Sequence, residues 1–291
     1  EAADLQSAGF DRSPTPPIKV GILLVHMKDV NENKLKKEII FNYLPKFKDF
    51  SLDIEIFNEI NSTNSYLLEK IQDENVISIC LAEKQSSGRG RSGKVWQSPV
   101  SKNIYLSMSF LSRIPLNKFE GFSLFIALNI SKTIKKLYSF SPLIKWPNDL
   151  FLNDKKFGGI LIETKSIDGK LLMVIGIGLN VSMKENKYID QKWTSIQKEN
   201  PLLEVDRNEL IAGIISEIMN DLSLFERYGF KYFKEDYESL HMLKNQKVIS
   251  SNHPGEKCIA LDVNEDGSLN LIIEKKKNRV TSGEVSLKIQ K

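Results

Sequence analysis

The chain has 291 residues, 41% of them hydrophobic and 27% charged, a composition that is typical of folded globular proteins and excludes disordered and collagen-like chains. Its 41 Lys and Arg against 37 Asp and Glu give a net charge of +4, too small on its own to indicate a nucleic-acid or membrane partner. Cys80 and Cys258 show neither disulfide-framework nor zinc-ligand spacing. We therefore predict no metal site made of protein ligands, and a reducing, cytoplasmic compartment.

The first 26 residues are expected to be a disordered leader or an expression tag. Three prolines among residues 14–17 oppose helix formation, and the pair His26-Met27 resembles a cloning junction. The alternative is a genuine edge strand over residues 19–25. The apolar stretch there is far shorter than the ~20 residues that a membrane-spanning helix requires, and the acidic start does not fit a signal peptide.

Helix and strand patterns alternate through the following part of the chain. Apolar residues repeat every four positions along residues 121–138, the clearest early helical stripe. Asp206 and Glu209 form a capping box for a helix that Gly229 closes. Further helices are predicted over residues 31–43 and after Ser62, and strands over residues 52–57, 76–82, 104–110, 143–152, 158–163 and 171–181, with turns at Asn153-Asp154 and Asp168-Gly169. The pattern predicts a sheet packed against helices.

The pattern of predicted elements changes after about residue 240. Short strand patterns follow Lys244, separated by turn signals at residues 253–255, 265–267 and 275–278. This spacing is typical of a small β-barrel of ~45 residues. We therefore predict a domain boundary near residue 240.

A glycine-rich basic loop, GRGRSGKVW, covers residues 88–96 and follows a predicted strand. Glycine allows close backbone approach, and the guanidinium groups of Arg89 and Arg91 can bind a carboxylate or phosphate bidentately. Only seven arginines occur in the whole chain, so two within three positions favour an anion site. The spacing is neither that of a P-loop nor that of a dinucleotide fingerprint, and the alternative is a solvated basic hairpin.

Two further segments combine unusual residue types. KWPNDLFLNDKKFGGILIE, residues 145–163, places Pro147 and Asp149 where they interrupt a strand, and such breaks are common at functional sites. GIGLNV, residues 176–181, has glycines that suit a strand over which a ligand lies closely. Each segment alone is also compatible with turn or packing chemistry.

Together with Ser62-Thr63-Asn64, these motifs occur in the order and approximate spacing found in the biotin protein ligases, and the resemblance covers about residues 35–291. It implies an α+β catalytic domain over residues 27–240, with a mixed, largely antiparallel sheet flanked by helices, and an SH3-like β-barrel over residues 241–291. It implies joining of biotin to ATP, with Mg²⁺, to give biotinyl-5′-AMP and pyrophosphate. The biotinyl group would then pass to one lysine of the biotin carboxyl carrier protein of acetyl-CoA carboxylase.

The resemblance also implies a role for each matching residue. Biotin contacts would come from Ser62, Thr63, Asn64, Gln85, Arg89, Gly90, Arg91, Lys156, Gly159 and Leu161. ATP or adenylate contacts would come from Arg89, Arg91, Lys94, Trp96, Asn148, Lys156, Asn180 and Trp193. A carboxylate that attacks ATP approaches a polyanion, so catalysis needs positioned positive charge, here from Lys156 and Arg91. Asp149 is expected to be a base or orienting group for the carrier lysine, the alternative being a structural turn carboxylate.

This sequence departs from the family pattern at two loop positions and at its start. Ser92 and Lys94 stand where arginine is frequent, which predicts weaker retention of the adenylate because Lys is a point charge. Some family members carry an N-terminal helix-turn-helix that represses biotin synthesis genes. No such pattern is readable before residue 35, so we expect a ligase without repressor function and without a DNA or membrane partner.

Two other functions were weighed. A lipoate or octanoate ligase or transferase shares the implied catalytic fold, but the GRGR and KWPND elements favour biotin. A non-enzymatic nucleic-acid binder would show interleaved aromatic and basic residues on an exposed sheet, whereas residues 235–257 carry charges of both signs. The sequence leaves open whether the protein is a monomer or a homodimer.

Overall fold

The computed structural model describes residues 34–100, 102–282 and 286–290, so the predicted leader of residues 1–26 lies outside the described residues. The chain divides into residues 1–32 and a compact unit of residues 33–291, and the description that follows concerns the second. Within the described ranges, no helix combines the length and the apolarity that crossing a membrane demands.

The described residues form six α-helices and twelve strands, with three short 3₁₀ turns. The helices are α1 (Lys37–Tyr43), α2 (Thr63–Glu69), α3 (Phe122–Tyr138), α4 (Ile196–Glu199), α5 (Arg207–Tyr228) and α6 (Lys234–Glu238). The strands are β1 (Ser51–Phe57), β2 (Val76–Ala82), β3 (Asn103–Ser112), β4 (Leu143–Lys145), β5 (Asp149–Leu152), β6 (Lys155–Ile167), β7 (Lys170–Asn180), β8 (Lys247–Ser250), β9 (His253–Val263), β10 (Leu269–Ile273), β11 (Lys276–Val280) and β12 (Leu287–Ile289).

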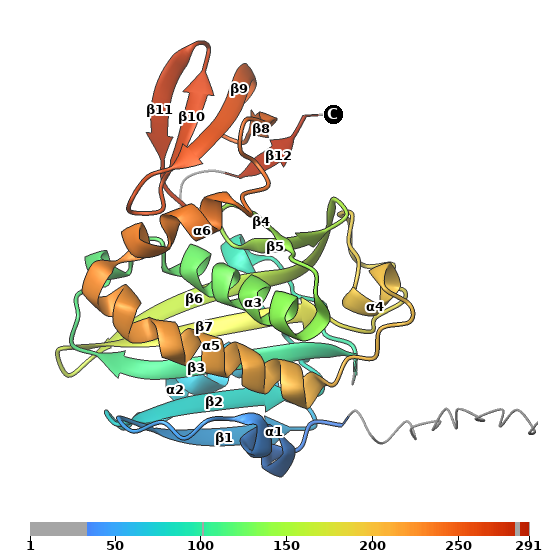
Figure 1. Ribbon diagram of the computed structural model, residues 1–291, viewed down its shortest axis with the longest axis vertical. Coiled ribbons are helices and arrows are strands. Elements are labelled where there is room, and N and C mark those ends of the chain that lie inside the picture. Colours follow the sequence, from blue (N-terminus) through green and yellow to red (C-terminus); the bar gives the residue numbers. More distant parts are fainter. Residues whose placement is uncertain (1–33, 101, 283–285, 291) are drawn as a thin grey trace, which may run out of the picture. The chain divides into compact units, whose positions relative to one another are not determined.

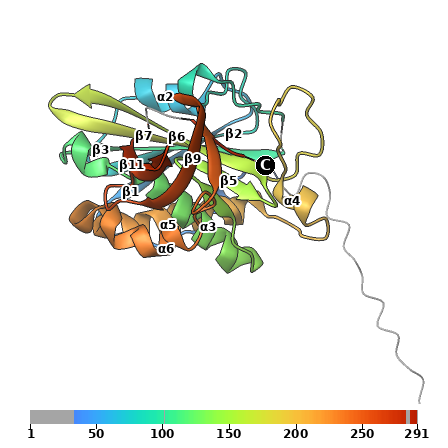
Figure 2. The same ribbon diagram turned by 90° about the horizontal axis from the view of Figure 1, so that it is seen from above.

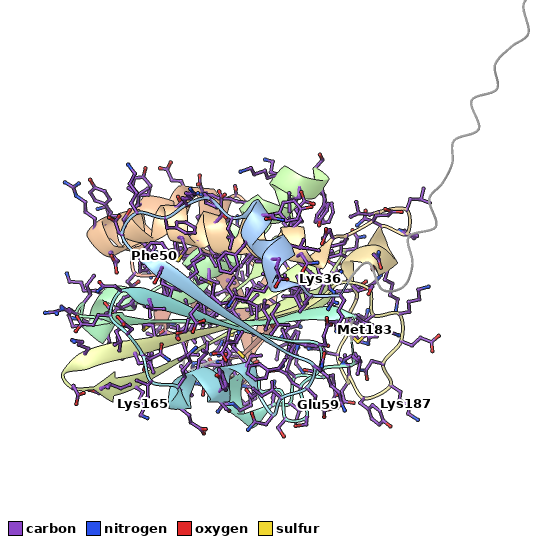
Figure 3. The ribbon with its side chains drawn as sticks, turned by 90° about the horizontal axis from the view of Figure 1, so that it is seen from below. Lys36, Phe50, Glu59, Lys165, Met183 and Lys187 are labelled. Atoms are coloured by element: carbon purple, nitrogen blue, oxygen red, sulfur yellow. The ribbon has the colours of Figure 1, made fainter. Side chains whose placement is uncertain are left out.

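The first seven strands form one sheet in the order β1-β2-β3-β7-β6-β5-β4. Among these described strands, β1 and β2 run parallel, and every other neighbouring pair is antiparallel. Figure 3 shows β1 with Phe50 just before the strand and Glu59 just beyond its end. The prediction of a mixed, largely antiparallel sheet is confirmed.

Tight turns set the hairpins at the centre of this sheet, because their residues tolerate positive φ. Asn153 and Asp154 have φ of 46° and 59° between β5 and β6, and Asp168 and Gly169 have φ of 49° and 77° between β6 and β7. Asn, Asp and Gly are the residues that adopt this conformation most readily. Both hairpin turns were predicted, and both are confirmed.

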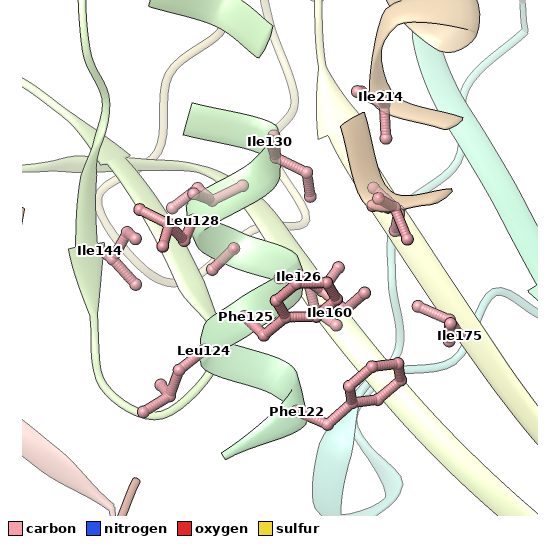
Figure 4. Close-up of a cluster of buried hydrophobic side chains, with 14 of the residues drawn as sticks. Phe122, Leu124, Phe125, Ile126, Leu128, Ile130, Ile144, Ile160, Ile175 and Ile214 are labelled. Atoms are coloured by element: carbon pink, nitrogen blue, oxygen red, sulfur yellow. The ribbon is translucent and has the colours of Figure 1, made fainter. Parts of the chain in front are cut away.

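Helices cover both faces of the sheet (Figures 1 and 2). Helix α2 packs on β2, β3 and β7, whereas α3 and α5 lie side by side on the opposite face, α3 over β4 and β6 and α5 over β3. Phe122, Phe125 and Ile126 of α3 meet Ile160 and Ile175 of the sheet in the main hydrophobic cluster (Figure 4). Eleven of the 17 residues of α3 are therefore buried.

A small residue allows α5 to pack closely on α3. A Cβ atom added at Gly213 of α5 would lie 2.8 Å from Cγ2 of Thr133 on α3. Asp206 begins α5 by accepting hydrogen bonds from the backbone N–H groups of Asn208 and Glu209, and the helix ends at Gly229, as predicted.

The remaining strands form a second, antiparallel sheet in the order β11-β10-β9-β8-β12, consistent with the predicted SH3-like domain. Its interior includes Val248, Ala260 and Leu271, which join the same hydrophobic cluster as the first sheet. Trp146 Nε1 donates a 3.0 Å hydrogen bond to the Gly267 carbonyl of this second part. The boundary predicted near residue 240 falls between α6 and β8, and the division into two domains stays a prediction.

Several boundaries differ from the prediction. The turn predicted at residues 275–278 lies at Glu274 and Lys275, because residues 276–278 belong to β11. The strand predicted over residues 143–152 is two strands, β4 and β5, because Pro147 has no N–H to donate to a ladder and the chain turns there. The turn predicted at residues 253–255 is wrong, since these residues begin β9 and the chain turns one step earlier at Ser251 and Asn252. Helix α1 begins at Lys37, later than the pattern from residue 31 suggested.

Candidate functional site

A cavity of about 410 Å³ opens over the centre of the first sheet, within the size range of small-molecule sites. Its walls come from the start of α2, the loop of residues 88–96, the β4–β5 turn and the facing strands β6 and β7. The predicted site residues on its wall are Ser62, Thr63, Asn64, Gln85, Arg89, Gly90, Arg91, Lys94, Trp96, Asn148, Asp149, Lys156, Gly159 and Leu161. The structure thus brings together nearly all residues that the motifs singled out.

The start of α2 forms a polar floor. Ser62 caps the helix by accepting from the backbone N–H of Ser65, as the sequence predicted. Thr63 and Asn64 follow it and are buried. The backbone N–H of Thr63 donates a 2.9 Å hydrogen bond to Gln85 Oε1, and Gln85 Nε2 donates to Ser98. Buried polar groups held in this way keep a fixed direction for binding a polar ligand.

The basic loop is folded over the cavity by its own hydrogen bonds and by its arginines. Arg89 forms a 2.7 Å ion pair with Glu163 on β6. Arg91 donates a 2.9 Å hydrogen bond to Asn148 and another to the Ser282 carbonyl. Burial lowers the pKa of Arg91, and the nearby Asp149 carboxylate partly offsets this shift. The arginines are therefore anchored on the protein, which disfavours the alternative of a solvated hairpin.

The end of the loop places an indole ring on the glycine strands. A Cβ atom added at Gly178 of β7 would lie 2.5–2.8 Å from the indole of Trp96, and one at Gly159 of β6 would lie 3.2 Å from it. Only glycine leaves room for this contact. Trp96 Nε1 is buried and has no hydrogen-bond partner within the described part of the chain. The strand glycines thus make a flat bed for the Trp96 ring, and the prediction from GIGLNV of a ligand that lies over these strands stays a prediction.

Positive charge gathers at one side of the cavity. Lys156 Nζ lies 2.6 Å from Asp149 Oδ1 and 5.6 Å from the centre of the Trp96 ring. Lys145 also lines the cavity, and burial lowers the pKa of its ammonium group, with Lys94 and Lys156 adding to the shift. Of the described residues on the wall, Asp149 is the single carboxylate. Such a surplus of cations suits a polyanion.

No cluster of metal ligands accompanies these charges in the described residues. No group of three or more His, Cys, Asp or Glu side chains that could hold a metal ion occurs in residues 34–100, 102–282 and 286–290.

Comparison with known proteins identifies the family of this site. Residues 56–180 match the family described as biotin/lipoate A/B protein ligase. These residues belong to the biotin/lipoate A/B protein ligase family. The matched region contains every cavity-lining motif described above. Four other residues of the lining lie outside it, namely Gln191, Ser251, Ser286 and Leu287.

Three relatives illustrate the likeness. The bifunctional ligase/repressor BirA of Escherichia coli is 37% identical over 198 residues, which are 67% of this chain and 61% of that protein. The biotin--[acetyl-CoA-carboxylase] ligase of Mycobacterium tuberculosis is 25% identical over 240 residues, 80% of this chain and 88% of that one. A biotin protein ligase from Aquifex aeolicus, solved with biotin and ATP, matches with a TM-score of 0.70 at 26% identity, covering 82% of this chain and 99% of that one. The chain thus spans about three fifths of the length of the E. coli relative.

Two predicted residues of the ligase-family site do not line the cavity. Asn180 is buried and donates a 3.0 Å hydrogen bond to the Thr194 carbonyl. Trp193 pairs through its backbone with Lys156 and lies under Lys198, whose Nζ is 4.6 Å from the ring centre. Both residues fix the segment that runs beside Lys156, so in this structure they support a wall residue and do not face the cavity.

Other residues on the wall were not predicted. Lys145 and Trp146 belong to the KWPND element but were not assigned a role, and Gly176 and Gly178 belong to GIGLNV. The KWPND and GIGLNV motifs that contain these four residues were the sequence signal that could have identified them. Tyr105 on β3 also lines the cavity, and no sequence pattern distinguishes it from the buried residues around it.

Proposed function

We propose that the protein joins biotin to ATP to form biotinyl-5′-AMP and then transfers the biotinyl group to a lysine of a carrier protein. The observation that carries this proposal is a single cavity that combines a directional polar floor, a bed of strand glycines and a cluster of cations beside one carboxylate. The family match and the relatives named as biotin protein ligases support the same activity.

The polar floor and the cation cluster suit the two ends of biotin. A ureido ring carries N–H groups beside a carbonyl, and Ser62, Thr63 and Gln85 offer hydroxyl and amide groups to satisfy them in a largely enclosed site. The valeryl carboxylate would then reach toward Lys156 and the loop arginines. A lipoyl ring has no such polar groups, so it would leave the buried floor unsatisfied.

The first step is an attack of the biotin carboxylate on the α-phosphorus of ATP. A bond forms between a carboxylate oxygen and phosphorus, and the bond from phosphorus to the β-phosphate bridging oxygen breaks, which releases pyrophosphate. Both reactants are anions, so positive charge from Lys156 and Arg91 would stabilise the charge that develops at phosphorus. Mg²⁺ would enter as the counter-ion of ATP and neutralise the β- and γ-phosphates.

The second step is an attack of the carrier lysine on the carbonyl of the adenylate. The neutral amine forms the amide bond, AMP leaves, and the amine loses its proton. Asp149 holds Lys156 at 2.6 Å and faces the same cavity, so it would orient Lys156 and receive or direct this proton. The folded loop of residues 88–96 would exclude water, which otherwise hydrolyses the adenylate.

The carrier that we propose is the biotin carboxyl carrier protein of acetyl-CoA carboxylase. The M. tuberculosis relative is named for that acceptor and is covered over 88% of its length. We also propose a reducing, cytoplasmic location, because Cys80 and Cys258 are both free and buried. Burial raises the pKa of the Cys80 thiol to about 12, which keeps it unreactive.

The half-reaction tests the activity without the carrier. The protein is incubated with Mg·ATP and either biotin or lipoate, and exchange of labelled pyrophosphate into ATP is measured. We expect exchange that depends on biotin. Exchange with lipoate alone would support the alternative of a lipoate-protein ligase, and no exchange with either acid would contradict the proposed adenylation.

A further inference from the structure

Glu163 ends a chain of polar groups that runs beneath the cavity. It lies on β6, two residues beyond Leu161 and on the same face of the strand. Its Oε2 atom accepts a 2.9 Å hydrogen bond from Asn64 Nδ2 and a 2.7 Å bond from the Arg89 guanidinium. The other acceptor near Asn64 Nδ2, the Leu161 carbonyl, lies at a longer 3.4 Å. Glu163 is therefore the main partner of the Asn64 amide nitrogen.

The Glu163 carboxylate fixes which groups donate and which accept in the hydrogen bonds that link Asn64, Ser107 and Thr63. Paired with Arg89, it is ionised and can only accept, so the Asn64 NH₂ group faces Glu163 and the Asn64 carbonyl faces Ser107. Ser107 has one proton and lies 2.5 Å from Asn64 Oδ1 and 2.7 Å from Thr63 Oγ1. Because the amide oxygen can only accept, Ser107 donates to Asn64, which leaves the Ser107 oxygen free to accept. The Thr63 hydroxyl then has two acceptors in reach, Ser107 Oγ at 2.7 Å and Gln85 Oε1 at 3.1 Å.

The direction of this chain decides what Thr63 presents to a ligand. With its proton directed to one of these two protein acceptors, Ser107 or Gln85, the Thr63 hydroxyl offers lone pairs to the cavity. Ser62 accepts from Ser65 N–H and keeps its own proton, while Gln85 turns its NH₂ group away from Thr63. The floor then presents the Thr63 acceptor beside the Ser62 hydroxyl donor. That pattern is complementary to a cyclic urea, in which an N–H group stands beside a carbonyl.

We propose that Glu163 is a positioning residue that sets this donor–acceptor pattern and so determines selection of a cyclic urea, an inference that rests on the proposed function. Without the carboxylate, the Asn64 amide is free to turn over, Ser107 can donate to Thr63, and Thr63 can donate to Gln85. The Ser107 hydroxyl then occupies one lone pair of Thr63, which is no longer available to a ligand. Thr63, Asn64 and Ser107 are all buried, so water does not restore the lost direction.

The test uses Glu163→Leu and Glu163→Gln in the full chain. Steady-state adenylation is measured with biotin and with its two cyclic carbamate analogues, each of which replaces one ring N–H by oxygen. We expect Glu163→Leu to raise KM for biotin about tenfold, with kcat changed less than threefold, because a misdirected hydrogen bond weakens binding by about that factor. Its preference for biotin over one carbamate should fall by a similar factor. Glu163→Gln keeps an oxygen acceptor and should restore most of both quantities.

A control separates positioning from other roles. Glu59→Leu removes a comparable exposed ion pair, with Lys84 at 3.0 Å, at the rim of the sheet (Figure 3), and should leave KM and preference unchanged. An unchanged preference in Glu163→Leu, or an equal loss in Glu59→Leu, would overturn the proposal. Failure of the unmodified chain to adenylate biotin would instead contradict the proposed function.

Discussion

Two adjacent lysines on β6 allow the catalytic role of the cation cluster to be isolated. Lys156 faces the cavity and pairs with Asp149 at 2.6 Å, whereas Lys155 faces away and pairs with Glu199 at 2.8 Å. Both pairs are partly exposed, so their contribution to stability lies between that of surface and buried pairs, about 1–2 kcal/mol each. Lys156→Gln and Lys155→Gln should therefore lower the free energy of unfolding by similar amounts.

Their effects on catalysis should differ sharply. Removing one positioned charge that stabilises a developing anion costs about 10²–10³ in rate, so Lys156→Gln should reduce biotin-dependent pyrophosphate exchange by that factor. Lys155→Gln should leave exchange within about twofold, because the charge that it removes faces Glu199. Urea unfolding of both variants provides the stability comparison. Equal rates for the two variants would refute the assignment of Lys156 to the reaction.

Three further variants test the ring bed, a buried histidine and a buried ion pair. Gly178→Ala should displace the Trp96 indole at a cost of about 1–3 kcal/mol and raise KM for ATP about tenfold, and an unchanged KM would speak against Trp96 as a nucleotide contact. Burial lowers the pKa of His241 to about 4, so the neutral imidazole contributes its full stability above pH ~6.5. About 3 kcal/mol of the free energy of unfolding should be lost as the pH falls from there toward 4. Urea unfolding at a series of pH values should show a smaller pH dependence of this free energy in His241→Phe. Arg207→Met should cost about 3–5 kcal/mol in chemical denaturation, because it leaves the Glu83 carboxylate buried without its 2.8 Å partner, and a loss below 1 kcal/mol would contradict this.

Local patterns predicted the elements whose causes are local. The helical stripe of residues 121–138, the cap at Asp206 and the hairpin turns all depend on residues within a few positions of each other, and the structure has them where expected. The strand break at Pro147 was foreseen as an irregularity but not as a division into β4 and β5. The start of β9 was missed because Pro254 and Gly255 are ordinary turn residues, whereas here Gly255 takes a φ of 86° within the strand.

The candidate site was predictable where motif residues themselves face the cavity. The residues of the GRGR loop and of the KWPND and GGIL elements meet there although they are far apart in the chain. Pairings between separate elements could not be read in the same way, because period and spacing carry no information on what a side chain meets across the fold. Glu163 is an example, since its contact with Asn64 joins β6 to α2. Asn180 and Trp193 show the converse, as motif positions whose side chains lie behind the wall.

The transfer reaction tests the central claim most directly. The full chain is incubated with biotin, Mg·ATP and a biotin carboxyl carrier domain of acetyl-CoA carboxylase, and the carrier is analysed by intact-mass and peptide mass spectrometry. The account predicts that the carrier gains the mass of one biotinyl group on a single lysine, only when ATP and biotin are both present. A carrier of unchanged mass, or one that is modified by lipoate and not by biotin, would contradict it.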